Sequence, residues 1–122
     1  MRLSRDIETE LYDALTDAGY SASAHSVPQS LGDNLPHVHI TRTGGYERDF
    51  VIEVNQIDFD IYAEDPADAL ICASQLCGVV RDLAGDIYYT SEITTLPYSN
   101  TDPRHPSIAR ATFKAQILTR TV

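Results

Sequence analysis

Two carboxylates, Asp58 and Asp60, lie two positions apart in the segment IDFDIYA, whose alternate residues are apolar. Because neighbouring side chains of a strand point to opposite faces, both carboxylates would share one face, as paired carboxylates in acid–base and metal sites often do. The other interpretation is a solvated sheet face that pairs with a later strand carrying Arg110, Lys114 and Arg120 on its polar side. We favour this second interpretation.

A second possible ligand pair is His37 and His39, which also share a strand face. A His-x-His pair with a distant carboxylate can bind a transition metal, but no third ligand follows at a recognisable spacing. We therefore favour histidines that hold no metal. The two cysteines, Cys72 and Cys77, have a spacing that suits neither a local disulfide nor a zinc site, and we expect small core residues in a reducing compartment.

Sequence motifs for catalysis or nucleotide binding are missing. There is no G-x-S-x-G nucleophile signature, no P-loop and no dinucleotide fingerprint. The pair Gly44-Gly45 stands alone and predicts a hairpin turn. We therefore expect neither an enzymatic activity nor a cofactor.

The overall composition is that of an ordinary globular protein. The 122 residues, 43% of them hydrophobic and 22% charged, predict one domain over residues 1–122. The formal net charge of −9 opposes attraction to a phosphate backbone, which argues against a free-standing DNA-binding protein. Neither a secretion signal nor a stretch of membrane-spanning length is apparent, so we expect a soluble protein.

Acidic and basic residues are separated along the chain. Residues 93–122 contain Arg104, Arg110, Lys114 and Arg120 against Asp102 alone, a net charge of +3 that leaves −12 on residues 1–92. The chain therefore has an acidic body and a basic C-terminal segment.

The first half of the sequence predicts one helix followed by strands. Apolar residues recur at every fourth position from Leu3, which predicts an amphipathic helix that ends at Gly19. Strands are predicted over 20–27, over 37–43 up to Gly44-Gly45, over 50–54 and over 57–63, with Asn55-Gln56 as a bulge or a tight turn. Residues 28–36 are predicted as a loop.

The second half predicts a helix and two more strands. Asp65 and Pro66 have the residue types that cap and begin a helix, and Gly85 is predicted to end it. Strands are predicted over 87–96 and 108–121, and the three prolines of residues 97–106 predict a loop between them. This order indicates an α+β domain with a mainly antiparallel sheet and two helices packed on one face.

Three features would be awkward in a monomer. Ile71, Cys72 and Val79 widen the apolar surface of the second helix, and the acidic and basic portions of the chain are segregated. The long proline-rich loop carries Tyr98, Arg104 and His105. One interpretation is a second layer of helix, an accident of surface charge and a floppy connection. The other is self-association, because unlike patches on one protomer favour head-to-tail contacts, which close into rings when the rotation permits.

Several of these segments together resemble the tail terminator proteins of long-tailed bacteriophages, over nearly the whole chain. They are the N-terminal amphipathic helix, the strand that ends in Arg42-Thr43-Gly44-Gly45, the segment QIDFDIYAEDPADAL with its Ala- and Leu-rich helix, and the strand ARATFKAQILTR. The resemblance implies a six-fold ring that caps the tail tube, stops its polymerisation and joins it to the head–neck connector. It also implies a place at the tail–neck junction of the virion, after assembly in the host cytoplasm.

On this hypothesis the protein has partners but no substrate. Six copies at −9 each would carry a formal −54, and an acidic lumen would let genomic DNA pass without specific binding. The expected partners are other copies of the chain, the tail tube protein and the head–tail connector or stopper protein. The alternatives are a related neck component, such as a head-closure or head–tail joining protein, and a metal-dependent enzyme or binder that uses His37, His39, Asp58 and Asp60.

The predicted oligomer or neck interface draws on three parts of the chain: the early strand and its glycines, the acidic strand, and the proline-rich loop with the closing strand. The candidate residues are Arg42, Gly44, Gly45, Asp58, Asp60, Tyr98, Arg104, His105, Arg110 and Lys114.

Overall fold

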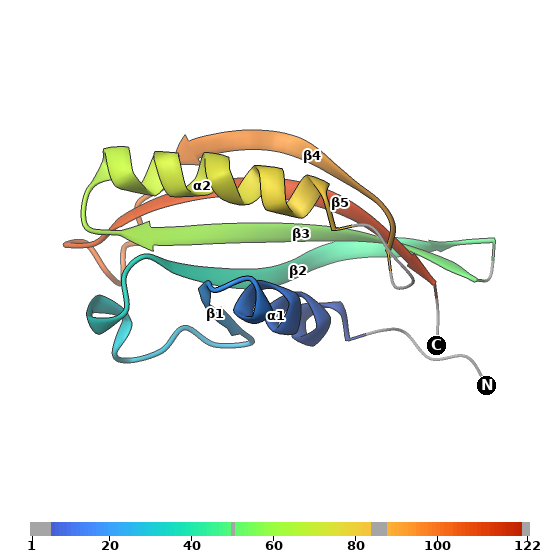
Figure 1. Ribbon diagram of the computed structural model, residues 1–122, viewed down its shortest axis with the longest axis horizontal. Coiled ribbons are helices and arrows are strands. Elements are labelled where there is room, and N and C mark those ends of the chain that lie inside the picture. Colours follow the sequence, from blue (N-terminus) through green and yellow to red (C-terminus); the bar gives the residue numbers. More distant parts are fainter. Residues whose placement is uncertain (1–5, 50, 84–87, 121–122) are drawn as a thin grey trace.

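The computed structural model describes residues 6–49, 51–83 and 88–120. Within these ranges the helices are α1 (Ile7–Asp17), the short 3-10 helix η1 (Leu31–Asp33) and α2 (Pro66–Arg81). The strands are β1 (Ser21–Ala24), β2 (His37–Arg48), β3 (Ile52–Ala63), β4 (Tyr88–Ser99) and β5 (Ala109–Arg120). The predicted α+β class is confirmed, and both α-helices pack against one sheet (Figure 1).

The sheet is mainly antiparallel, as predicted. Its strand order is β1-β2-β3-β5-β4, so that β1 and β4 form the two edges. Only the pairing of β1 with β2 is parallel among the described strands, and the long strands β2, β3, β5 and β4 pair in antiparallel fashion. The central strands are therefore β3 and β5, which contribute most of the apolar floor.

Helix α1 begins at Ile7, directly after its N-cap residue Asp6. The Asp6 carboxylate accepts a hydrogen bond from the Thr9 backbone N–H and another from the Thr9 hydroxyl, which stabilises the first turn. Ile7, Leu11 and Leu15 are fully buried, as their spacing predicts. The expected start at Leu3 lies outside the described residues, and the chain leaves the helix through Gly19, whose φ of +96° suits glycine.

Helix α2 begins as the sequence predicts. The Asp65 carboxylate accepts a hydrogen bond from the Asp68 N–H at 2.9 Å, and Pro66 is the first helical residue. The helix ends at Arg81, while the predicted stop at Gly85 falls outside the described residues. Of the three apolar residues expected beyond the buried stripe, Ile71 is 55% exposed, whereas Cys72 and Val79 are half-buried against the core.

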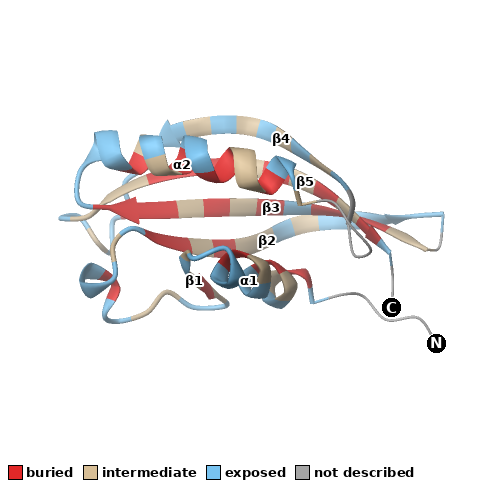
Figure 2. Cartoon of the chain, viewed as in Figure 1, coloured by how far each residue is buried: buried red, intermediate tan, exposed pale blue. Residues whose placement is uncertain are grey.

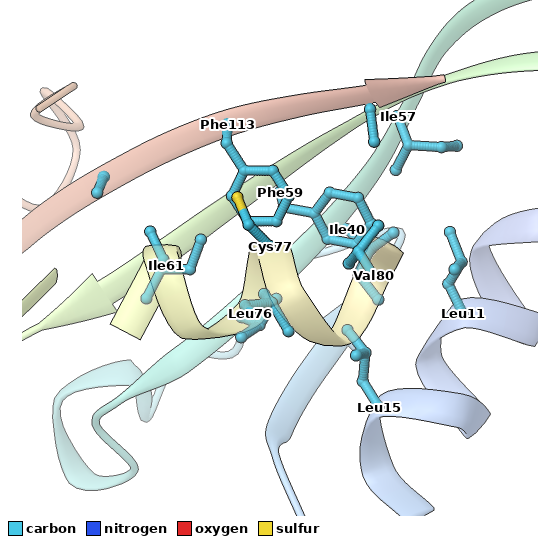
Figure 3. Close-up of a cluster of buried hydrophobic side chains, with 14 of the residues drawn as sticks. Leu11, Leu15, Ile40, Ile57, Phe59, Ile61, Leu76, Cys77, Val80 and Phe113 are labelled. Carbon is cyan, nitrogen blue, oxygen red and sulfur yellow. The ribbon is translucent and has the colours of Figure 1, made fainter. Parts of the chain in front are cut away.

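The core lies between the helices and the inner face of the sheet. Figure 3 shows Phe59 and Phe113 beneath α2, with Leu11 and Leu15 of α1 reaching toward the same layer. The two phenylalanine rings stack with centroids 4.8 Å apart, because their strands place them directly opposite each other. Figure 2 shows the same layer as red segments along β3. Each such side chain contributes about 1.5–3 kcal/mol by leaving water.

The predicted turn at Gly44-Gly45 is wrong. Strand β2 continues to Arg48, and the pairing with β3 shifts between Arg42 and Gly44, which is a β-bulge. Gly45 has a φ of +147°, and a Cβ at this position would clash with the Val54 carbonyl oxygen. Glycine is common in both turns and bulges, so the pair alone did not distinguish them.

The irregularity predicted at Asn55-Gln56 is also wrong, since β3 runs without interruption from Ile52 to Ala63. Asn55 is fully buried, and its amide donates hydrogen bonds to the Ile117 carbonyl at 3.1 Å and the Thr119 hydroxyl at 3.0 Å. These bonds on β5 satisfy a polar side chain inside a strand. Residue 50, where a strand was predicted to begin, lies outside the described residues.

Strand β4 extends further than predicted. It passes through Pro97 and Tyr98 to Ser99, where the sequence indicates a loop. A proline is tolerated there because β4 is an edge strand and its pairing with β5 is irregular between Thr95 and Tyr98. Residues 100–108 contain no helix or strand, so the loop begins three residues later than predicted and ends two residues later.

Candidate functional site: the open face of the sheet

The sheet face opposite the helices, here called the open face, carries most of the residues that could do chemistry. Even-numbered residues of β3 point to it, because their odd-numbered neighbours Ile57, Phe59 and Ile61 are buried under the helices. The strand register adds the residues opposite them. The open face comprises Ser21, Ser23, His37, His39, Asp58, Asp60, Tyr62, Arg110, Thr112 and Lys114.

Asp58 pairs with Lys114, as the solvated-face interpretation predicts. The two residues are direct partners in the β3–β5 register, and the Lys114 Nζ lies 3.6 Å from a carboxylate oxygen of Asp58. Burial raises the pKa of Asp58, an effect that the Lys114 charge opposes and the neighbouring Asp60 reinforces. The carboxylate is thus held by its cross-strand partner on a partly covered surface.

Asp60 has a neutral partner. The Thr112 hydroxyl donates a hydrogen bond of 2.6 Å to the Asp60 carboxylate, and the Asn100 amide donates one of 3.1 Å to the same hydroxyl oxygen. This chain of hydrogen bonds links Asp60 to β5 and to the loop that follows β4. The two carboxylates share a face but are tied to different residues of β5.

His37 and His39 share the open face, as predicted, and each contacts a serine. His37 Nδ1 lies 2.9 Å from the Ser21 hydroxyl, and His39 Nδ1 lies 2.7 Å from the Ser23 hydroxyl. The Ser23 hydroxyl is also 2.8 Å from His37 Nε2. Burial lowers the pKa of both histidines, so both are neutral at pH 7.

Sequence reasoning missed the two serines. Ser-x-Ser in β1 and His-x-His in β2 have the same spacing, and the parallel register places Ser21 beside His37 and Ser23 beside His39. This matched two-residue spacing was the sequence signal that could have indicated the serine–histidine contacts. Ser23 resembles an activated nucleophile because it contacts histidines. However, the Ser23 side chain is buried, and the Asp60 carboxylate is engaged by a short hydrogen bond from Thr112.

No group of three or more His, Cys, Asp or Glu side chains that could hold a metal ion occurs within residues 6–49, 51–83 and 88–120. The imidazole Nδ1 atoms of His37 and His39 instead face serine hydroxyls. What this arrangement offers is a hydrogen-bonded polar surface.

A second cluster, which the sequence did not reveal, centres on Asp102. This carboxylate is only 2% exposed and accepts hydrogen bonds from the Tyr62 hydroxyl at 2.9 Å and from the Arg104 N–H at 3.0 Å. The Arg110 guanidinium lies 3.5 Å from the same carboxylate. Burial alone would raise the pKa of Asp102, but these hydrogen bonds and the two arginine charges outweigh it and lower the pKa.

The Asp102 cluster holds the proline-rich loop against the sheet. Arg110 lies over the Tyr62 ring, 5.8 Å from its centroid, and the His105 ring meets Tyr62 edge-on at 6.0 Å. A floppy connection, one of the interpretations of this loop, therefore does not describe residues 100–105. Arg110 thus contacts the loop directly, through Asp102 and the Asn100 carbonyl, while the charge of Asp60 also acts on it.

The predicted interface residues fall into two groups. Asp58, Asp60, Arg110 and Lys114 lie on the open face, with Arg104 and His105 in the loop beside it and Tyr98 on β4 opposite Thr112. Arg42, Gly44 and Gly45 lie on β2 at and beyond the bulge, where the exposed end of the β2–β3 hairpin begins (Figure 2). The structure thus brings most residues of the first group together on or beside the open face, and it places the two glycines in a separate part of the molecule.

Two hollows lie away from these carboxylates. One of about 390 Å³ is on the helix side, where Tyr20, Pro36, Val38 and Cys72 contribute to its lining. The other, of about 410 Å³, runs beside β1 and is lined by Thr9, Tyr12 and residues 22–25. Neither Asp58 nor Asp60 is among the residues that line these two hollows.

Comparison with protein-family models and with curated proteins found no match to the chain. Neither described α-helix has the length and apolar character needed to cross a membrane. The function must therefore be inferred mainly from the open face and its hydrogen bonds.

Proposed function

We propose that this chain is a non-enzymatic structural protein, a bacteriophage tail terminator that works as a ring through contacts between copies and with its neighbours. The proposal rests on the family resemblance of the sequence and on one observation in the structure. Titratable side chains of the open face each have a partner on a neighbouring strand: Asp58 contacts Lys114, Asp60 accepts a hydrogen bond from Thr112, and the two histidines contact serines. Groups held in this way suit surface complementarity better than proton transfer.

The proposed mechanism is selective surface matching. A terminator presents one surface that matches the last ring of the tail tube and another that does not, so that no further tube subunit can add. The second surface instead matches the head–tail connector or stopper protein. The net charge of −9 per copy makes the ring lumen acidic, which repels the phosphates of the genomic DNA as it passes.

The test is the oligomeric state of the purified chain, alone and with tail tube subunits. Light scattering is expected to give six times the chain mass, and electron microscopy is expected to show a six-fold ring bound to one end of assembled tubes. A chain that stays monomeric at high concentration, even with tube subunits present, contradicts the proposal. Binding to the connector without any effect on tube length would instead favour another neck component.

The enzymatic alternative has its own test. Alanine at His37, His39, Asp58 and Asp60, introduced one at a time, is expected to leave ring assembly intact, apart from small losses of stability. Turnover of a substrate that disappears when a single one of these carboxylates is neutralised would overturn the structural role.

A further inference from the structure

The structure leaves both edges of the sheet without a strand partner, within the residues that it describes. We propose that the ring closes through these edges, with β4 of one copy adding to β1 of the next copy. This inference rests on the proposed ring and names its contact. Strand addition of this kind gains main-chain hydrogen bonds, and side chains in neighbouring pockets give it specificity.

The β1 edge is built to accept a strand. Residues 22–25 line a hollow of about 410 Å³ together with Thr9 and Tyr12 of α1. Strand β1 has the sequence SASA, so its small side chains leave the backbone accessible from the side of the hollow. The aromatic ring of Tyr12 is 37% exposed there and provides an apolar wall.

Strand β4 has features that suit it to join the sheet of another copy. In the described part of the sheet, β4 pairs with β5 alone. Edge strands are commonly protected by charges or by proline. Strand β4 has a single charged side chain, Glu92, and its proline, Pro97, lies near the end of the strand. Leu96 is 69% exposed and Tyr98 is 39% exposed, so this strand offers apolar side chains to a partner. Figure 2 shows exposed and intermediate segments along β4.

The two edge strands themselves carry little charge that would oppose a second copy. Two copies of a chain with a net charge of −9 repel each other, and they meet with least repulsion where acidic side chains are scarce. Strand β1 has no charged residue and β4 has one. Helix α1 borders β1 and α2 packs against β4, so the repulsion that remains in this contact comes from acidic side chains of the helices.

The topology fixes the direction of the contact. Strands β1 and β2 are parallel, and three antiparallel pairings connect β2 to β4, so β1 and β4 run in opposite directions (Figure 1). A copy that continues the sheet with its helices on the same side therefore makes an antiparallel pair. This contact is head-to-tail and can close into a ring, whereas pairing β4 with β4 has two-fold symmetry and ends at a dimer.

A charge-exchange experiment tests the contact. Leu96→Lys on β4 and Tyr12→Asp beside β1 are each expected to raise the protein concentration needed for half-assembly by at least about tenfold, because each places a charge in an apolar contact. The double variant L96K/Y12D is expected to recover assembly, since every contact then joins the introduced lysine of one copy to the introduced aspartate of the next. Light scattering across a dilution series measures assembly, and circular dichroism checks that each variant is folded.

Ile71→Lys is the matched control, because Ile71 is an exposed apolar residue of α2 that lies beside Leu35 and Pro36 and in neither edge strand. It is expected to assemble as the unmodified chain does. Rings that persist in both single variants would overturn the edge contact and leave the proposed function standing. Failure of the unmodified chain to form rings would overturn both, and a dimer that L96K disrupts and L96K/Y12D does not restore would show a β4–β4 contact instead.

Discussion

Asp102 is a buried carboxylate whose partners come from β3, from the loop and from β5. It accepts a hydrogen bond from Tyr62, 40 residues earlier in the chain, and lies 3.5 Å from Arg110. Asp58 differs because both it and Lys114 remain partly exposed to solvent. Hydrogen bonds to a buried charge contribute about 1.5–3 kcal/mol, whereas an exposed ion pair contributes about 0–1 kcal/mol. Asp102 should therefore matter more to stability.

Asp102→Asn is expected to lower the free energy of unfolding at pH 7 by about 1.5–3 kcal/mol, because a charged acceptor becomes a neutral one. The lowered pKa gives this loss a pH dependence: the carboxylate stabilises the fold fully above its ordinary pKa of 3.8 and loses that effect as the pH falls through the lower folded-state pKa. Urea unfolding of both proteins at several pH values should show their difference shrinking below pH 3.8.

Asp58→Asn serves as the control for this measurement. Burial raises the pKa of Asp58, so its ionised form gains nothing from folding, and the substitution should change stability by less than about 1 kcal/mol at pH 7. A loss for Asp58→Asn equal to that for Asp102→Asn would show that burial and hydrogen bonding do not distinguish the two carboxylates.

At the scale of elements, the β2–β3 hairpin depends on a bulge at its two glycines. Gly45 has a positive φ and no room for a Cβ, while a Cβ on Gly44 would meet nothing closer than a Gln56 side-chain oxygen at 3.9 Å. The Thr43 hydroxyl donates a hydrogen bond to the Gln56 carbonyl beside the shifted register. The bulge is therefore a specific structural feature of the β2–β3 hairpin, and its two glycines have different roles.

Gly45→Ala is expected to destabilise the protein by about 1–3 kcal/mol, because it combines an unfavourable backbone conformation with a clash against the Val54 carbonyl oxygen. Gly44→Ala is expected to stay within about 1 kcal/mol of the unmodified chain. Thermal unfolding measures both. Equal losses at the two positions would contradict the distinction drawn from the space around them.

The elements that were predictable are those with local signals. Asp65-Pro66 marks the start of α2, and the alternation around Phe113 marks β5, since caps and periodicity depend only on near neighbours. The Asp102 cluster was not predictable, because it joins residues tens of positions apart. Pro97 led to a wrong prediction of where β4 ends, for another reason. A strand tolerates a proline when it lies at the edge of a sheet, and the position of a strand in the sheet depends on the whole fold.

At the scale of the whole molecule, two electrostatic effects compete in assembly. Attraction between the acidic body and the basic C-terminal segment would favour head-to-tail contact, and the net charge of −9 opposes it. However, the basic residues of that segment have partners within the same chain. Lys114 lies near Asp58, and Arg104 and Arg110 lie near Asp102. Little positive charge is left for a neighbouring copy, so repulsion should dominate.

Ring assembly is therefore expected to strengthen as salt is added, because the screening length falls from about 30 Å at 0.01 M to about 8 Å at 0.15 M. Sedimentation velocity at both salt concentrations measures the fraction of chains in rings. Asp33→Asn combined with Asp82→Asn, two exposed positions outside the strands, changes the formal charge from −9 to −7 and should weaken the salt dependence. Rings that dissociate as salt rises would instead show that attraction between unlike patches holds the copies together.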